Sequence, residues 1–272
     1  MTTVEAADGV QLYAEAHGGG VPLIFSCALN TTHENWRLQI SPLVDAGIRV
    51  ILWDYRGHGL SESPPEASAY SIDHVVDDLA RVHDWAAQGE PAVLAGLSFG
   101  GLASLHFALR HPERVRGLVL VDSGPGFKNP KAQENWARAT ERTATFIESR
   151  GMEAFVQKAV ATTVGGKPEL PEARAAARAI AAQNPAGLAH FARRVAGRTP
   201  PVIDELVSID CPALVVVGEK DEPYLQAALV MTAKLPRAHA FTVPGAGHIV
   251  NIEAAEVFNA EVIRFLSQFS PA

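Results

Sequence analysis

Short apolar segments that alternate with longer amphipathic ones restrict the fold of this chain more than any other feature. Buried strands are predicted in residues 22–26 and 49–54, and further strands in residues 92–97, 115–121, 213–217 and 238–243. Two weaker strands, in residues 3–6 and 11–17, precede them. Helices are predicted in residues 31–46, 71–87, 99–110, 225–234 and 254–268. Strands that alternate with helices form a parallel sheet covered on both faces. The pattern therefore predicts an α/β fold with a mostly parallel sheet of eight strands.

One long segment, residues 127–209, lacks any strand pattern. Its Pro and Gly residues divide it into about four helices, and Asn129 before Pro130 is a helix-start signal. Because the segment begins and ends at strand edges, we expect a helical cap inserted into a core of residues 1–126 and 210–272. Residues 128–198 carry twelve Lys or Arg and six Glu, whereas the whole chain has a net charge of −7. A basic cap on an acidic core could steer an anionic substrate, although solvated helix faces give the same pattern.

A nucleophile is predicted at Ser98, within Gly96-Leu97-Ser98-Phe99-Gly100. The motif follows a predicted strand and opens a predicted helix, as a nucleophile elbow requires. Glycines at 96 and 100 allow the strand and the helix to approach each other closely. The turn would place the hydroxyl at a helix N-terminus, where negative charge is stabilised.

A serine hydroxyl needs a base, and ten histidines are available. His248 lies in Pro244-Gly245-Ala246-Gly247-His248, directly after the last predicted strand, so a glycine-flanked loop can direct it over the sheet edge. We predict that it is the base. His58 precedes Ser98 among turn residues and is expected to be structural.

The acid is expected after the predicted strand of residues 213–217, where three carboxylates follow closely. Asp221 is the predicted acid, because its short side chain can fix the imidazole tautomer and stabilise the imidazolium. Glu219 and Glu222 are local alternatives. Asp122, at the end of the predicted strand 115–121, is a remote alternative that a helix-cap or turn role would also explain. The carboxyl ends of parallel strands converge on one side of a sheet, so Ser98, Asp221 and His248 are expected to meet there.

These motifs resemble those of the α/β-hydrolase superfamily over nearly the whole chain. The matching segments are residues 54–61, 96–100, 218–221 and 244–248. The resemblance implies the α/β-hydrolase fold and an oxyanion hole formed by the backbone N–H groups of Phe99 and Ala28. Residues 26–30 read Ser-Cys-Ala-Leu-Asn, where members usually carry His-Gly. This stretch and the following Thr31, Thr32 and Trp36 are similar to the 3-oxoadipate enol-lactonase group.

Candidate substrate-binding residues come from the loops near the predicted triad and from the cap. They are Leu29, His33, Trp136, Phe146, Arg193, Arg194 and Ile249. Of the arginines, Arg193 and Arg194 are adjacent, so that one of them could point inward. Cys27 is not expected to be the nucleophile, because the motifs place no base beside it.

The resemblance implies a serine hydrolase that cleaves a small or medium carboxylic ester or lactone. Two alternatives remain: a carbon–carbon bond hydrolase with the same triad, and a small-molecule binding protein with vestigial hydrolysis. The acidic balance argues against a nucleic-acid partner. No signal peptide, membrane span, dinucleotide or phosphate-loop motif or metal cluster is recognised, so we expect a cytoplasmic protein without cofactor or metal.

Overall fold

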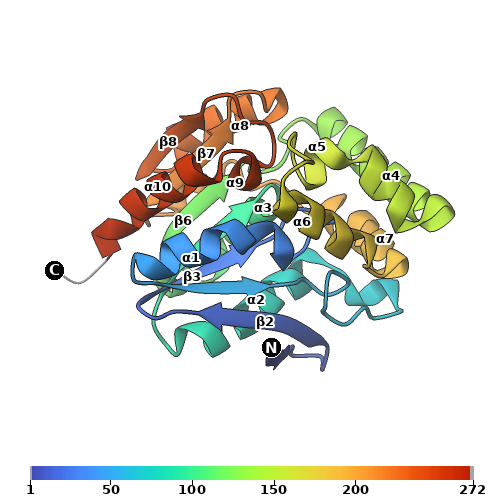
Figure 1. Ribbon diagram of the computed structural model, residues 1–272, viewed down its shortest axis with the longest axis horizontal. Helices are drawn as coiled ribbons and strands as arrows, with labels where there is room; N and C mark the ends of the chain where they lie inside the picture. Colours follow the sequence, from blue (N-terminus) through green and yellow to red (C-terminus); the bar gives the residue numbers. More distant parts are fainter. Residues whose placement is uncertain (1, 270–272) are drawn as a thin grey trace.

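The computed structural model describes residues 2–269 and contains one eight-stranded sheet (Figure 1). The strands are β1 (Thr2–Glu5), β2 (Gln11–His17), β3 (Val21–Ser26), β4 (Ile48–Trp53), β5 (Ala92–Leu97), β6 (Val115–Val121), β7 (Ala213–Gly218) and β8 (Ala238–Val243). They lie in the order β1-β2-β4-β3-β5-β6-β7-β8. The β1–β2 and β2–β4 pairs are antiparallel, and all other pairs are parallel. The predicted eight-stranded, mostly parallel sheet is confirmed.

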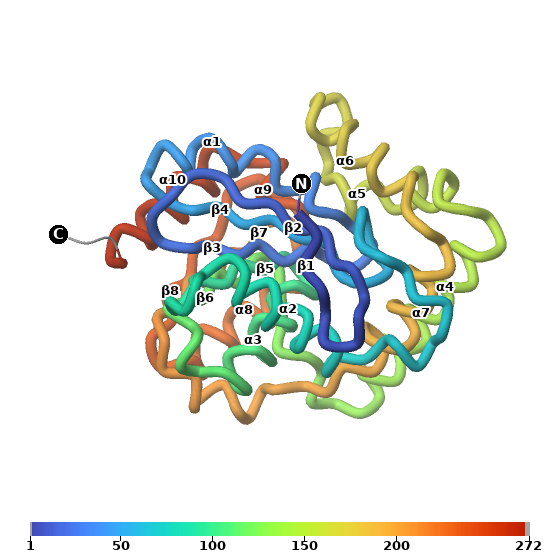
Figure 2. The backbone as a smooth tube through the Cα atoms, turned by 90° about the horizontal axis from the view of Figure 1, so that it is seen from below, coloured from blue at the N-terminus to red at the C-terminus, as the bar shows by residue number. Residues whose placement is uncertain are grey.

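Helices cover both faces of this sheet. They are α1 (Arg37–Asp45), α2 (Ile72–Ala87), α3 (Phe99–Arg110), α8 (Glu222–Lys234), α9 (Val250–Glu253) and α10 (Ala255–Leu266). Figure 2 shows α1, α9 and α10 on one side of the strands and α2, α3 and α8 on the other. All residues of β3, β5 and β7 are buried, as expected for central parallel strands.

The helix predicted from Thr31 begins later. A 3₁₀ turn (His33–Trp36) precedes α1, and the capping side chain is that of Thr32, which accepts from the Glu34 N–H. The Thr31 hydroxyl instead donates to the Ala28 carbonyl at 3.0 Å. A turn through residues 28–31 therefore takes the place of the predicted first helical turn.

Four helices between β6 and β7 lie together at one end of the molecule (Figure 1). They are α4 (Pro130–Lys158), α5 (Val160–Thr163), α6 (Pro171–Ala181) and α7 (Pro185–Phe191), followed by a π-helical turn (Ala192–Ala196). Asn129 caps α4 as predicted, and α4 is interrupted at Gly151, which has φ +79°. We call residues 127–209 the cap segment. Residue 1 and residues 270–272, which the predicted core includes, lie outside the described residues.

Polar contacts join the cap segment to the loop after β3. The Gln183 side chain donates to the Asn30 carbonyl at 2.9 Å, and Asn35 donates to the Thr163 carbonyl at 2.6 Å. The cap segment thus lies over the edge of the sheet at which β5 and β7 end.

Among the helices of residues 2–269, none is both long enough and apolar enough to cross a membrane.

Candidate active site

Ser98 lies at the turn between β5 and α3 in a strained backbone conformation. Its φ of 54° and ψ of −114° are unusual for a residue with a side chain. A Cβ atom on Gly96 would lie 2.1 Å from the carbonyl carbon of Gly100, and one on Gly100 would lie 2.4 Å from the Ser26 carbonyl oxygen. Only glycines at these positions allow a turn this tight, which explains the spacing of the motif.

His248 and Asp221 form a close pair beside this turn. The His248 Nδ1 lies 2.7 Å from Asp221 Oδ2, and both side chains are largely buried. Asp221 follows β7 and precedes α8, while His248 follows β8. Glu253 holds the histidine loop by accepting from the Gly247 N–H at 2.9 Å. With Nδ1–H directed to the carboxylate, Nε2 is left as the acceptor nitrogen of the imidazole.

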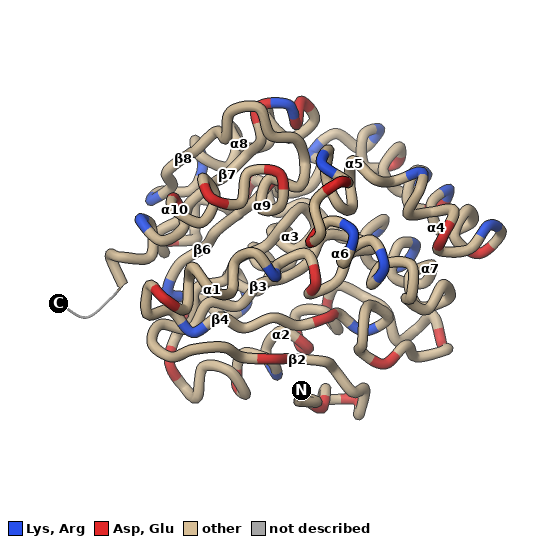
Figure 3. The backbone as a smooth tube through the Cα atoms, in the orientation of Figure 1, with Lys and Arg blue, Asp and Glu red and all other residues tan. Residues whose placement is uncertain are grey.

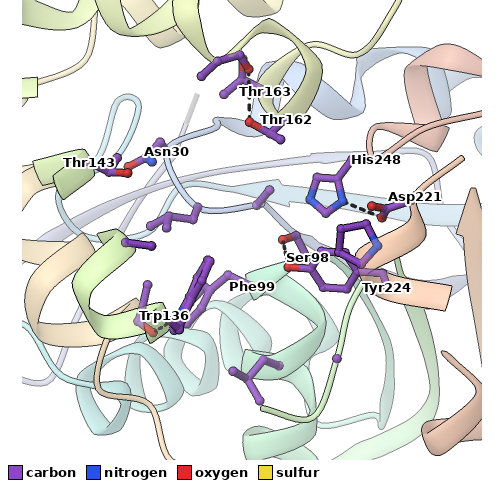
Figure 4. Close-up of a pocket in the computed structure, with 18 of the residues that line it drawn as sticks. Asn30, Ser98, Phe99, Trp136, Thr143, Thr162, Thr163, Asp221, Tyr224 and His248 are labelled. Atoms are coloured by element: carbon purple, nitrogen blue, oxygen red, sulfur yellow. Dashed lines mark hydrogen bonds and ion pairs between the residues drawn. The ribbon is translucent and has the colours of Figure 1, made fainter. Parts of the chain in front are cut away.

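Figure 4 shows His248 between Asp221 and Ser98 at the edge of one cavity. The Ser98 hydroxyl does not bond to His248 in this arrangement; its partner among residues 2–269 is the Tyr224 hydroxyl, at 3.4 Å. Catalytic hydrogen bonds are often long without substrate and shorten in the complex. The structure therefore brings the predicted serine, histidine and aspartate to one cavity, although no hydrogen bond joins Ser98 to His248 in the described residues.

Tyr224 is a residue of this site that the sequence motifs did not indicate. Its ring centroid lies 4.8 Å from that of His248, and burial raises the pKa of its phenol, which keeps the hydroxyl protonated at neutral pH. It stands three positions after Asp221, in the first turn of α8. That spacing places it beside the acid, but no motif distinguishes it from the other residues of the helix.

Ala28 and Phe99 line the same cavity as Ser98. In the described part of the chain, the N–H groups of Ala28 and Phe99 have no hydrogen-bond acceptor. Free amide groups beside a nucleophile can stabilise an oxyanion. The loop that carries Ala28 is held by His58, whose Nε2 accepts from the Asn30 N–H at 3.2 Å. Burial lowers the pKa of His58 to about 4, so the ring is neutral and accepts this bond, in agreement with the structural role expected for it.

The cavity has a volume of about 800 Å³ and lies between the sheet edge and the cap segment. Three predicted substrate-binding residues line it, namely Leu29, Trp136 and Phe146. Apolar side chains dominate the lining, which also includes Phe127 and Phe155. Such a cavity suits a small organic substrate.

The other four predicted substrate-binding residues do not line this cavity. His33 is buried against Asp54, with 2.7 Å between Nδ1 and Oδ2. Ile249 is fully buried in the core. Arg193 pairs on the surface with Glu141 and Glu148, at 2.9 and 2.5 Å.

Arg194 is exposed and also lies outside the cavity. These four assignments are corrected: acidic partners hold His33 and Arg193, core packing holds Ile249, and Arg194 is exposed outside the cavity lining.

The alternative acids and the cysteine have other environments. Glu219 accepts from the Gly245 N–H at 2.8 Å, and Glu222 is exposed. Cys27 is buried, and burial raises the pKa of its thiol well above the ordinary value, so it is a poor nucleophile. Among residues 2–269 no three His, Cys, Asp or Glu side chains gather as a metal site would require.

Comparisons with known proteins bear on the family and the fold of this chain. The model of a family described as alpha/beta hydrolase fold matches residues 21–255. The chain is 30% identical over 271 residues to a putative carbamate hydrolase RutD of Variovorax paradoxus, covering 95% of this chain and 97% of that one. It is 28% identical to 3-oxoadipate enol-lactonase 2 of Acinetobacter baylyi, covering 98% and 97%. A malate-bound thermophilic esterase from Thermogutta terrifontis superposes with a TM-score of 0.87 at 25% identity, covering 99% of each chain.

Proposed function

The chain belongs to the α/β-hydrolase fold family and is a hydrolase, and from this premise we propose that it is a serine hydrolase of small or medium carboxylic esters or lactones. The observation that carries the proposal is the position of Ser98, beside both the His248–Asp221 pair and two free backbone N–H groups. Nucleophile, base, orienting acid and oxyanion donors are the four parts that acyl transfer needs.

The proposed mechanism has two steps. His248 Nε2 accepts the Ser98 proton while Oγ attacks the substrate carbonyl, and the oxyanion accepts from Ala28 and Phe99. The imidazolium, stabilised by Asp221, then protonates the leaving oxygen, which departs and leaves an ester on Ser98. A water molecule activated by His248 attacks this acyl-enzyme and releases the carboxylic acid. No bond change in this sequence requires a cofactor.

The cap segment supplies one wall of the proposed substrate site and its free cations. Figure 3 shows Lys and Arg along α4, interspersed with acidic residues. Of these, Arg142 and Lys158 line the cavity, and neither has a carboxylate partner within residues 2–269. Lys158 Nζ lies 4.4 Å from the centre of the Phe146 ring. We therefore propose that the preferred substrates carry a carboxylate distant from the scissile bond.

The reaction class is tested with a substrate panel on the purified protein. We expect hydrolysis of p-nitrophenyl esters and of unsaturated lactones, and faster hydrolysis of carboxylate-bearing esters than of neutral esters of equal length. A vinylogous diketone tests the alternative carbon–carbon hydrolysis. If the diketone is cleaved and no ester or lactone is, the ester assignment is wrong. Turnover of none of the three compounds would favour a binding protein.

Substituting the cavity cations tests the charge preference. Arg142→Ala and Lys158→Ala should each lower kcat/KM for an anionic ester by about 3- to 10-fold, because a partly exposed ion pair contributes about 1 kcal/mol. The neutral ester should be hydrolysed as before. Arg138→Ala is the matched control, since Arg138 lies on the same helix, is exposed and pairs with Glu134 outside the cavity. Equal losses for both esters would refute a carboxylate contact.

A further inference from the structure

Asp122 is a buried carboxyl group that the proposed mechanism does not use. It follows β6, is 0% exposed, and has a φ of +42°, which is strained for a residue other than glycine. Its backbone N–H donates to the Val216 carbonyl at 2.8 Å, which ties it to β7. Strain and full burial of an acidic residue beside an active site suggest a role beyond that of a turn.

The two carboxylate oxygens of Asp122 have different surroundings. Oδ1 accepts from the Gly218 N–H at 2.8 Å. Oδ2 is buried and has no hydrogen-bond partner within residues 2–269. The Asp221 N–H donates to the Gly218 carbonyl at 3.0 Å, so Asp122 and Asp221 both bind Gly218. The Val250 N–H lies near the Asp122 carboxyl group but forms no hydrogen bond to Oδ2, and no Lys or Arg of residues 2–269 forms an ion pair with Asp122. A buried carboxylate oxygen without a bonded donor is costly, so the arrangement needs explanation.

A single proton resolves this arrangement. Two adjacent buried carboxylates cannot both be ionised without strong repulsion. Asp221 is stabilised as the anion by His248 at 2.7 Å, whereas Asp122 lacks a cationic partner. Burial, reinforced by the charge of Asp221, raises the pKa of Asp122 well above its ordinary value. A proton on Oδ2 converts the orphaned acceptor into a donor directed at Asp221.

We propose that Asp122 is a neutral carboxylic acid that donates a hydrogen bond to Asp221 and so positions the Asp221–His248 pair. The proposal rests on the proposed function, because it assigns Asp122 a role through Asp221. The bond would hold the Asp221 carboxylate in the orientation that His248 requires. It would also disperse part of the negative charge that Asp221 presents to His248. Asp122 is thus a positioning residue, and the other titratable groups around it are Asp221, Tyr224 and, beyond Asp221, His248.

Two substitutions separate this role from a purely structural one. Asp122→Asn retains an oxygen for the Gly218 N–H and supplies an N–H donor to Asp221. Asp122→Leu, of similar size, removes both. We expect Asp122→Leu to lower kcat by about 10- to 100-fold, as for loss of a hydrogen bond to a charged group, and Asp122→Asn to restore most of that loss. The acid limb of the kcat/KM profile should move to higher pH in Asp122→Leu, because the negative charge that Asp221 presents to His248 is no longer dispersed, and should stay in place in Asp122→Asn.

The protonation state can be measured without activity. Difference infrared spectroscopy of wild type against Asp122→Asn at neutral pH should show the carbonyl stretch of a protonated carboxylic acid in the wild type alone. This measurement decides the proposal if Asp122→Leu does not fold or if the ester assignment fails. Absence of the band overturns the proposal. So does an acid limb that moves to lower pH in Asp122→Asn, since that shift means a negative charge was removed.

Discussion

Ser98→Ala should lower kcat for ester hydrolysis by roughly 10⁴- to 10⁶-fold, the largest effect expected of any single substitution. Removing Oγ eliminates the acyl-enzyme, while the residual rate comes from binding and from the oxyanion donors alone. The fold should be preserved, because the strained turn depends on Gly96 and Gly100 rather than on the hydroxyl, whose partner in the structure is Tyr224. Single-turnover kinetics would measure the loss of the chemical step, and equilibrium substrate binding would show whether substrate affinity is retained.

The control for this substitution is Ser149→Ala. Ser149 is exposed on α4, and its hydroxyl donates to the Phe146 carbonyl, outside the cavity. Its kcat should match that of the wild type. If Ser98→Ala retains more than about a tenth of the wild-type kcat, Ser98 is not the nucleophile.

Asp221→Asn should lower kcat by about 10⁴-fold, and His248→Ala by a similar or larger factor. The amide would present an N–H to His248 Nδ1, which favours the tautomer that cannot accept the Ser98 proton. Because the three residues act as one unit, the Ser98→Ala/His248→Ala double variant should be about as slow as Ser98→Ala alone. Additive losses would show that the two side chains act independently.

Measuring kcat of amide variants also shows which of the three acidic residues, Asp221, Glu219 or Glu222, is the catalytic acid. Glu219→Gln and Glu222→Gln should retain kcat within a few fold, because one carboxylate binds the Gly245 N–H and the other is exposed. If Asp221→Asn is active and one of these two variants is inactive, the acid has been assigned to the wrong carboxylate.

Much of the site could be predicted because backbone topology determines it. A strand–turn–helix with small residues at 96 and 100 allows few geometries, and the carboxyl ends of β5 and β7 meet at one sheet edge. The positions of Ser98, Asp221 and His248 follow from that topology without knowledge of side-chain packing. The eight-stranded sheet follows from the same alternation of strands and helices.

Side-chain direction within the cap segment could not be predicted in the same way. Arg193 and Arg142 are both cationic residues in helical segments, yet Arg193 turns to Glu141 and Glu148, whereas Arg142 faces the cavity. The choice depends on helix rotation and on partners more than 40 positions away, which helical periodicity does not specify. Leu29, Trp136 and Phe146 line the cavity, where the Trp136 N–H also donates to the Ala196 carbonyl at 2.8 Å.

Hydrogen bonds between polar groups far apart in the chain could not be predicted from the sequence either. Tyr224 contacts Ser98 across 126 positions, and Asp122 contacts the Gly218 N–H across 96. Its place at a strand end makes Asp122 a possible acid, but only the tertiary structure shows that its Oδ2 is buried without a hydrogen-bond partner in residues 2–269. The residues that tune the proposed triad therefore depend on tertiary packing, whereas its members follow from local motifs.

The central claim is that Ser98 is an activated nucleophile, and covalent labelling tests it most directly. The folded protein is treated with a fluorophosphonate, digested and analysed by mass spectrometry, with His248→Ala and heat-unfolded protein treated in parallel. We predict one stoichiometric adduct on Ser98 in the wild type, and little or none in the two controls. Absence of an adduct from the folded wild type, or an adduct on a residue other than Ser98, would contradict the account.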